Sequence, residues 1–256
     1  MKKLILRLVL SALILNITSS AVFAGELSAD SNDQKIEQIL IKLNQSTNDL
    51  KTYQGKIEYL FSQPLFDSQT LRKGDIYYKK HDSASTLRIN FHSIKQDQQP
   101  AQDIPDHYLF DGVWLTQVNY KLKAVKKHQM TEQDNPIDAF ELASRNFPII
   151  GFTRTDQLKK DFKISLQPSE SNKLIKLHLT VTPDSYYADD YTTIDFWIDK
   201  KIYLPVKITA VSTEEDIYQI ELIKPKVNKK LNQDIFKLDY PDEFGEPEII
   251  PLDKQQ

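Results

Sequence analysis

Residues 108–115 read Tyr108-Leu109-Phe110-Asp111-Gly112-Val113-Trp114-Leu115. Two apolar runs flank Asp111-Gly112, the dipeptide that a two-residue β-hairpin prefers because both turn residues need a positive φ. This stretch therefore predicts two antiparallel strands joined by a tight turn.

Alternating apolar and polar residues continue on both sides of this hairpin, which is the period of a half-buried strand. Residues 121–127 (KLKAVKK) predict a charged edge strand. Asp199-Lys200-Lys201 predicts a turn between two later strands. About ten strands with turn signals between them, and one long helix, favour a curved antiparallel sheet over βαβ units. The other strand-like runs are 57–61, 74–79, 87–91, 164–166, 174–181, 192–198, 206–211 and 217–223.

The one long helix is expected over residues 33–50, after a capping segment at Ser31-Asn32-Asp33. Its apolar side chains recur at spacings of three, four and seven, so they form a single stripe that faces the sheet. The residues of the stripe are Ile36, Ile39, Leu40, Leu43 and Leu50.

The first 24 residues have the pattern of a secretory signal peptide. MKKLILR gives a positive start, residues 8–15 give an apolar core too short to span a bilayer, and Ala24 ends a cleavage site. We expect cleavage after Ala24 and export of residues 25–256 as a single domain. The absence of cysteine fits the bacterial periplasm better than a eukaryotic exterior.

Composition excludes several classes of function. The chain of 256 residues has a net charge of −3, which gives no reason to expect nucleic acid as a partner. Zero cysteines exclude disulfides, thiolate metal sites and cysteine nucleophiles. Six glycines leave no material for a Gly-rich phosphate-binding loop. No nucleophile elbow or zinc-protease motif is present, so we expect a binding protein without a cofactor rather than an enzyme.

Two acidic segments raise the question of a metal ion. Asp103, Asp106 and His107, with Asp111 beyond them, offer carboxylate and imidazole ligands. Residues 95–107 nevertheless predict a polar loop, and Asp111 is already explained by the hairpin. Residues 186–191 (YYADDY) predict an exposed turn more than a calcium site. We expect no metal.

Residues 135–152 interrupt the strand pattern. Asn135-Pro136 predicts the start of a short helix, and Phe147-Pro148-Ile149-Ile150 continues it as an apolar loop. Two interpretations stay open: a helix that plugs the end of the sheet, or a lid over an apolar cavity.

The order of these features resembles the periplasmic outer-membrane lipoprotein carrier (LolA-like) and lipoprotein-sorting family. The residues that carry the resemblance follow the export signal and the helix. They are Leu50-Lys51-Thr52-Tyr53, Gly74-Asp75-Ile76-Tyr77-Tyr78-Lys79-Lys80, residues 109–115, Asn135-Pro136, Asp234-Ile235-Phe236-Lys237-Leu238 and Tyr240-Pro241.

The resemblance implies an unclosed β-barrel, covered by the N-terminal helix and a short lid helix, whose apolar interior holds lipoprotein acyl chains. It places a lid-latching basic residue at Lys80, where the family has Arg; Lys lacks the planar guanidinium fork. It also implies sorting to the outer membrane, with an inner-membrane release complex and an outer-membrane receptor as partners.

The apolar faces of the predicted elements supply the cavity residues for this carrier, which we expect to be a monomer. Two alternatives remain: an envelope protein of structural or regulatory role that binds a protein partner, and a hydrolase with a scattered site. The residues expected to line the cavity are Ile39, Leu43, Tyr59, Ile76, Tyr78, Phe91, Leu109, Trp114, Phe140 and Phe147.

Overall fold

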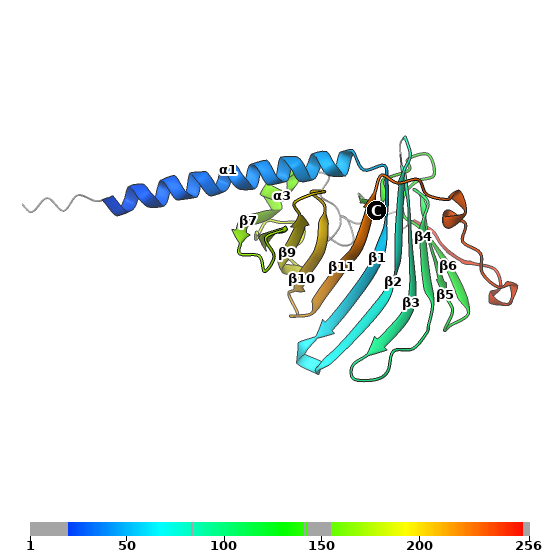
Figure 1. The fold of residues 1–256 in the computed structure, drawn as a ribbon. Coiled ribbons are helices and arrows are strands. Elements are labelled where there is room, and N and C mark those ends of the chain that lie inside the picture. Colours follow the sequence, from blue (N-terminus) through cyan, green and yellow to red (C-terminus); the bar gives the residue numbers. More distant parts are fainter. Residues whose placement is uncertain (1–19, 83, 141, 143–154, 253–256) are drawn as a thin grey trace, which may run out of the picture.

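The computed structural model describes residues 20–82, 84–140, 142 and 155–252 (Figure 1). The helices are α1 (Ser20–Asn48) and α3 (Thr155–Asp161), and Ala139, Phe140 and Leu142 are also helical. Three short 3₁₀ segments are η1 (Pro64–Phe66), η2 (Gln233–Phe236) and η3 (Asp242–Phe244). The strands are β1 (Thr52–Gln63), β2 (Ser68–Lys80), β3 (Ser85–Gln96), β4 (Asp106–Phe110), β5 (Trp114–Asn119), β6 (Ala124–Gln129), β7 (Phe162–Gln167), β8 (Leu174–Val181), β9 (Tyr191–Asp199), β10 (Pro205–Ser212), β11 (Ile217–Val227) and β12 (Glu248–Ile250).

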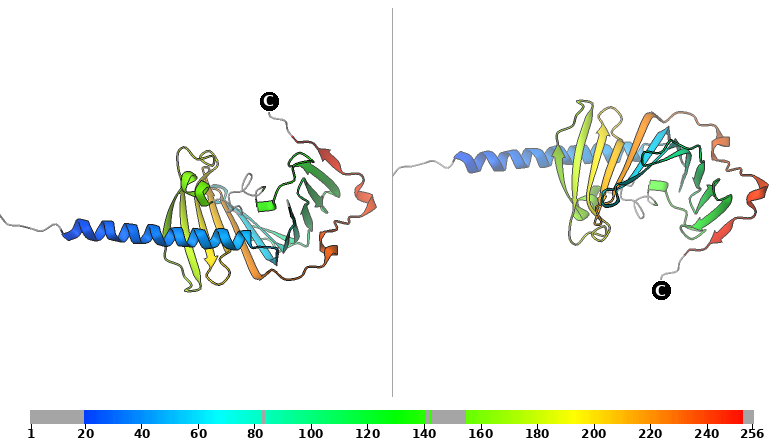
Figure 2. Two further views of the ribbon diagram at one scale, coloured as in Figure 1. Left: turned by 90° about the horizontal axis from the view of Figure 1, so that it is seen from above. Right: turned by 90° about the horizontal axis from the view of Figure 1, so that it is seen from below.

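The described strands form one curved, unclosed sheet of twelve, in the order β12-β6-β5-β4-β3-β2-β1-β11-β10-β9-β8-β7. Two antiparallel meanders, β1 to β6 and β7 to β11, meet along the β1–β11 pair. Only the short β12 pairs in parallel, with β6. The predicted class, a mainly β protein with a curved antiparallel sheet and covering helices, is confirmed (Figures 1 and 2).

Different segments pack on the two faces of the sheet, which we call the inner face and the outer face. The inner face packs against α1 and the turn at residues 137–142, and it holds the main apolar core. The outer face carries the C-terminal segment, residues 231–250. Figure 2 shows α1 crossing β7 to β10, and the C-terminal segment on the far side of β4 to β6.

The α1 stripe packs as predicted. Ile36, Leu40 and Leu43 are buried in the core, and Leu50 is buried just after the helix ends. The helix begins at Ser20 rather than at the predicted capping segment, so it runs through the expected cleavage position, and its N-terminal part projects beyond the sheet (Figure 1). Among the described residues, no helix combines the length and apolar character that a membrane crossing requires.

The hairpin between β4 and β5 is present, but its turn differs from the prediction. Gly112 has a φ of 105°, whereas Asp111 does not have a positive φ. The carboxylate of Asp111 instead accepts from the amides of Val113 at 3.0 Å and Trp114 at 2.8 Å. Because this side chain replaces a turn hydrogen bond, only the glycine needs the left-handed region.

The C-terminal segment is fixed to the outer face by one arginine and a stack of rings. The guanidinium of Arg88 donates to the carbonyls of Ile235 and Lys237. His107 packs edge-on against Tyr120, and Tyr120 against Phe244 of η3. The predicted edge strand at 121–127 is therefore wrong in part: residues 121–123 form a turn, and β12 covers β6.

Gly74 lies where β2 and β3 shift register, and this position has no room for a side chain. A Cβ there would lie 2.0 Å from the carbonyl oxygen of Asn90 and 2.8 Å from the Cα of Phe91. Both are backbone atoms, so they can move only if the strands separate. Gly74 thus permits the irregularity that bends this part of the sheet.

We predict that Gly74→Ala lowers the free energy of unfolding by about 3 kcal/mol, the upper range for overpacking that moves backbone. Gly55→Ala is the matched control, because its Cβ would meet the carbonyl oxygen of Ile223 at 3.1 Å, a much milder contact. Denaturant unfolding measures both. Equal losses in the two variants would contradict the steric account of Gly74.

The outer-face contacts also predict a pH dependence. Burial, reinforced by Arg88 and His92 and opposed by Asp106, lowers the pKa of His107 below its ordinary 6.5. The folded state therefore favours the neutral ring. The stability this contributes is full above the ordinary pKa of 6.5 and is lost as the pH falls from there through the lower pKa of the folded state. His107→Phe should abolish this component between pH 7.5 and 5 while keeping the packing against Tyr120. The same pH slope in parent and variant would refute the assignment.

Candidate functional site

An apolar cavity of about 70 Å³ lies on the inner face, between the C-terminal end of α1, strands β1, β2, β10 and β11, and the turn at 139–140. Its described lining is almost wholly aliphatic and aromatic. The lining residues are Thr47, Leu50, Tyr53, Ile57, Ile76, Tyr78, Leu87, Ala139, Phe140, Leu204, Pro205, Ile208, Ile220 and Leu222.

The segment that covers this cavity is anchored by backbone hydrogen bonds at its start. The amide of Ile137 donates to the carbonyl of Gly112 at 2.9 Å, in the β4–β5 turn. The amide of Ala139 donates to the fully buried hydroxyl of Ser85 at 2.7 Å. The β4–β5 hairpin therefore helps to hold the start of the covering segment in place.

The helical turn begins at Ala139, later than the predicted start at Pro136. Asp138 caps it, because its carboxylate accepts from the amide of Phe140 at 2.8 Å. The same carboxylate accepts from the hydroxyl of Tyr78 at 2.9 Å. The residue that caps the turn is thus also tied to the sheet.

Tyr78 joins the sheet to the covering turn in two ways. Its hydroxyl donates to Asp138, and its ring lies 4.7 Å from that of Phe140, centroid to centroid. Burial, with the nearby Asp138 carboxylate, raises the pKa of Tyr78, so the hydroxyl stays protonated and remains a donor. Tyr78 thus adds one charge-assisted hydrogen bond and one ring contact to the two hydrogen bonds that anchor the start of the covering segment.

We predict that Tyr78→Phe costs about 1.5 kcal/mol of stability, the range for a hydrogen bond to a charged acceptor. Since the ring is kept, hydrogen exchange of the Leu142 amide, which donates to Asp138, should increase while that of the β8–β9 pair stays unchanged. Asp138→Asn, which keeps an acceptor for the cap, should cost less than Asp138→Ala. Unchanged exchange at Leu142 in Tyr78→Phe would count against the latch.

Tyr53 carries a buried polar atom without a partner. Its hydroxyl makes no hydrogen bond within the described part of the chain, and the residue is only 6% exposed. Burial raises its pKa, so it too stays a protonated donor. A buried donor left unpaired is costly, and this one belongs to the cavity lining.

The predicted cavity residues lie in different parts of the structure. Ile76, Tyr78 and Phe140 line the cavity. Leu43 of α1 is buried in the core, while Tyr59 and Phe91 lie on the inner face with their rings 6.4 Å apart. Ile39 lines a separate groove beside α1. Phe147 lies outside the described residues.

Two of the predicted cavity residues are corrected by the strand register. Leu109 pairs with Arg88, and both lie on the outer face, opposite Phe110 in the core. Trp114 also lies outward, under the amine of Lys127 at 4.9 Å, while Leu115 packs on the core. The apolar runs there do not alternate, so the sequence could not indicate which residue points inward.

Lys80, expected to latch the lid, is exposed, and its amine donates to the carbonyl of Asn48 at 3.1 Å. That carbonyl ends α1, where helix carbonyls lack intrahelical partners and the dipole favours a cation. The described contact ties β2 to α1. Contacts with residues 143–154 lie outside the described part, so the latching role stays a prediction.

The acidic segment considered for a metal is divided between the two faces. Asp106 is a buried β4 residue, not a loop residue as predicted, and accepts from Arg72 at 2.8 Å, Tyr108 at 2.8 Å and Gln117 at 3.0 Å. Its neighbour His107 faces outward. Within the described residues, no group of three acidic or histidine side chains is placed to hold a metal ion.

One arrangement has the outline of a catalytic relay. His178 Nδ1 lies 2.6 Å from the carboxylate of Asp195, and Thr180 Oγ1 lies 3.5 Å from His178 Nε2. All three belong to the outward positions of β8 and β9, and none lines the cavity or the groove. A relay of this kind needs a pocket and an oxyanion site beside it.

Sequence reasoning missed Ile208, Ile220 and Leu222 of β10 and β11, together with Leu204 just before β10 and Pro205 at its start. The alternation within 206–211 and 217–223 contained the signal for the first three. The Tyr53 hydroxyl could not be found this way, because its isolation depends on three-dimensional packing.

No protein-family model matches the chain, and no curated protein matches it. Among solved structures, that of MucB is similar over 79% of this chain and 62% of MucB, at 11% identity and a TM-score of 0.50. The lipoprotein LppX of Mycobacterium tuberculosis is similar over 77% and 98%, at 12% identity and a TM-score of 0.45. A LolA-superfamily protein from Nitrosomonas europaea is similar over 80% and 98%, at 14% identity and a TM-score of 0.35.

At these identities the likeness concerns the fold alone, and this chain spans about three fifths of MucB. MucB has also been crystallised in complex with MucA.

Proposed function

We propose that this chain is a periplasmic binding protein that holds an acyl chain of a lipid-modified protein, or of a related lipid, for sorting to the outer membrane. The observation that carries the proposal is the apolar cavity under the turn at 139–140. Moving an acyl chain from water into an apolar site is favourable by roughly 0.8 kcal/mol for each buried methylene. A carrier must therefore offer an apolar site of this kind.

The size of the cavity predicts that it opens to bind. Ligand pockets usually measure about 300–1,000 Å³, and this one measures about 70 Å³. A full acyl chain therefore requires part of the lining to move. Phe140 is the side chain best placed to do so, because it is half-buried, lines the cavity and belongs to the covering turn.

We predict that Phe140→Ala binds a fluorescent fatty acid several-fold more tightly than the parent, because the aromatic ring that fills part of the binding space in the closed state is removed. Phe140→Trp should bind more weakly, since the larger ring fills the space. Leu60→Trp, on the opposite face of β1, is the control and should leave affinity unchanged. Titration of the delipidated protein measures all three, and indistinguishable affinities would reject the cavity as the binding site.

The unpaired Tyr53 hydroxyl gives the acyl chain a polar contact. An ester or amide carbonyl is a hydrogen-bond acceptor and sits where an acyl chain joins its head group or protein. Tyr53→Phe should leave the stability of the empty protein unchanged or slightly higher, since it removes an unpaired buried donor. The same change should weaken binding of an acyl ester more than binding of an alkane of equal length. Equal weakening of both ligands would argue against the carbonyl contact.

A second function, binding of a protein partner by an envelope protein, is favoured by one feature. The tip of the β1–β2 hairpin presents Leu65 and Phe66, which are 72% and 74% exposed. Adjacent exposed apolar side chains of this size often mark interaction surfaces. If Leu65→Ser with Phe66→Ser abolishes function in cells while fatty-acid binding persists, the partner-binding role is the principal one.

A further inference from the structure

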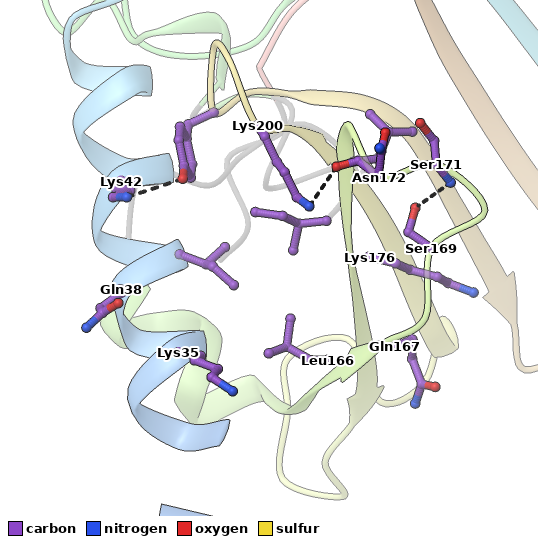
Figure 3. A pocket seen from close by; sticks show the side chains of 14 residues that line it. Lys35, Gln38, Lys42, Leu166, Gln167, Ser169, Ser171, Asn172, Lys176 and Lys200 are labelled. Atoms are coloured by element: carbon purple, nitrogen blue, oxygen red, sulfur yellow. Dashed lines mark hydrogen bonds between the residues drawn. The ribbon is translucent and has the colours of Figure 1, made fainter. Parts of the chain in front are cut away.

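A second concavity, separate from the acyl cavity, lies between α1 and strands β7 and β8 (Figure 3). It measures about 420 Å³, which is within the range of small-molecule sites. Ile39 of α1, Leu166 of β7 and Ile175 of β8 supply apolar side chains to its lining. Neither its lining nor its strands β7 and β8 are shared with the cavity at residues 139–140.

The rim of this groove is basic. Lys35 and Lys42 lie on α1 about two turns apart, and Lys200 comes from the loop after β9 (Figure 3). No acidic residue is among the described residues that line it. The charge of a fourth lining lysine, Lys176, is compensated, because its amine pairs with Asp195 at 3.0 Å on the outer face.

The described contacts of two rim lysines leave their charge uncompensated. The amine of Lys42 donates to the hydroxyl of Tyr203 at 3.2 Å and lies 4.9 Å above that ring. The amine of Lys200 donates to the carbonyl of Asn172 at 2.8 Å. Both acceptors are neutral, so these contacts orient the ammonium groups without neutralising them.

The backbone at Tyr203 is held in an unusual state that serves this arrangement. Tyr203 has a φ of 48°, in the left-handed region that bulky side chains avoid. Its amide donates to the carbonyl of Asp199 at 2.8 Å, which closes the loop that carries Lys200. One strained turn thus presents both Lys200 and the ring that orients Lys42.

We infer that this groove binds an anionic phospholipid, with the phosphate of the head group on the basic rim that Lys35, Lys42 and Lys200 form and the first carbons of the chains against Ile39, Leu166 and Ile175. Ammonium groups from separate segments suit a phosphate, whose several oxygens accept in different directions. The apolar floor favours an amphiphile over a free anion.

Short-chain lipids below their micelle concentration test this site. Dihexanoyl phosphatidylglycerol, titrated calorimetrically into the full mature protein, should bind at least about tenfold more tightly than dihexanoyl phosphatidylcholine, whose head group is neutral overall. Its affinity should fall as salt is raised. Inorganic phosphate should bind more weakly than phosphatidylglycerol; equal affinity would remove the lipid from the proposal, and equal binding of the two lipids would overturn it.

Matched variants locate the site. Lys35→Gln, Lys42→Gln and Lys200→Gln together should reduce phosphatidylglycerol binding about tenfold or more, while the corresponding Lys→Arg triple should stay close to the parent. Lys226→Gln, Lys229→Gln and Lys230→Gln make the same charge change at exposed positions elsewhere and should have little effect. Equal losses of phosphatidylglycerol affinity in the two Gln triples would show that only net charge matters, and would refute binding in the groove.

Phe140→Trp separates this inference from the proposed function. It should weaken fatty-acid binding in the cavity and leave phosphatidylglycerol binding in the groove unchanged. Loss of both ligands in that variant would overturn the separate site, whereas loss of groove binding in the rim triple alone leaves the acyl proposal intact.

Discussion

A curved sheet that does not close leaves an apolar inner face, and this face must be covered by something other than another strand. In this protein α1 covers the β7 to β10 part, and the turn at 137–142 covers the part near β2 and β3. Neither cover is a strand of the sheet. The cavity lies where the two covers approach each other, and its existence follows from the incomplete closure.

The polar groups on the inner face are few and placed at the boundary of the apolar region. Ser85, Tyr78 and Asp138 fix the covering turn with hydrogen bonds. Asp106 accepts from three side chains, those of Arg72, Tyr108 and Gln117. The Tyr53 hydroxyl differs from these because it has no partner among the described residues. Satisfied groups specify the fold, and the unsatisfied one is available to a ligand.

Local pattern predicted the sheet, the stripe on α1 and the positions of most strands, because periods of 2 and 3.6 are properties of short segments. It failed where both neighbours in a strand are apolar. Leu109 and Phe110 have similar hydropathy, and only pairing with β3 places Phe110 inward. Contacts between distant segments, such as Tyr78 with Asp138 and Lys80 with Asn48, cannot be predicted from the periodicity of a short segment. The predicted start of the covering turn was too early. Asn135-Pro136 suggested a helix start there, whereas Asp138 provides the cap.

The central claim is that an acyl chain occupies the space under Phe140. A fatty acid with a photoreactive diazirine near the end of its chain, bound to the delipidated protein and irradiated, gives the most direct test. Peptide mapping by mass spectrometry should find the label on β1, β10 and β11, at lining residues such as Ile57 and Ile208, and excess unlabelled fatty acid should remove it. Label confined to the outer face, or spread over the surface without competition, would contradict the account.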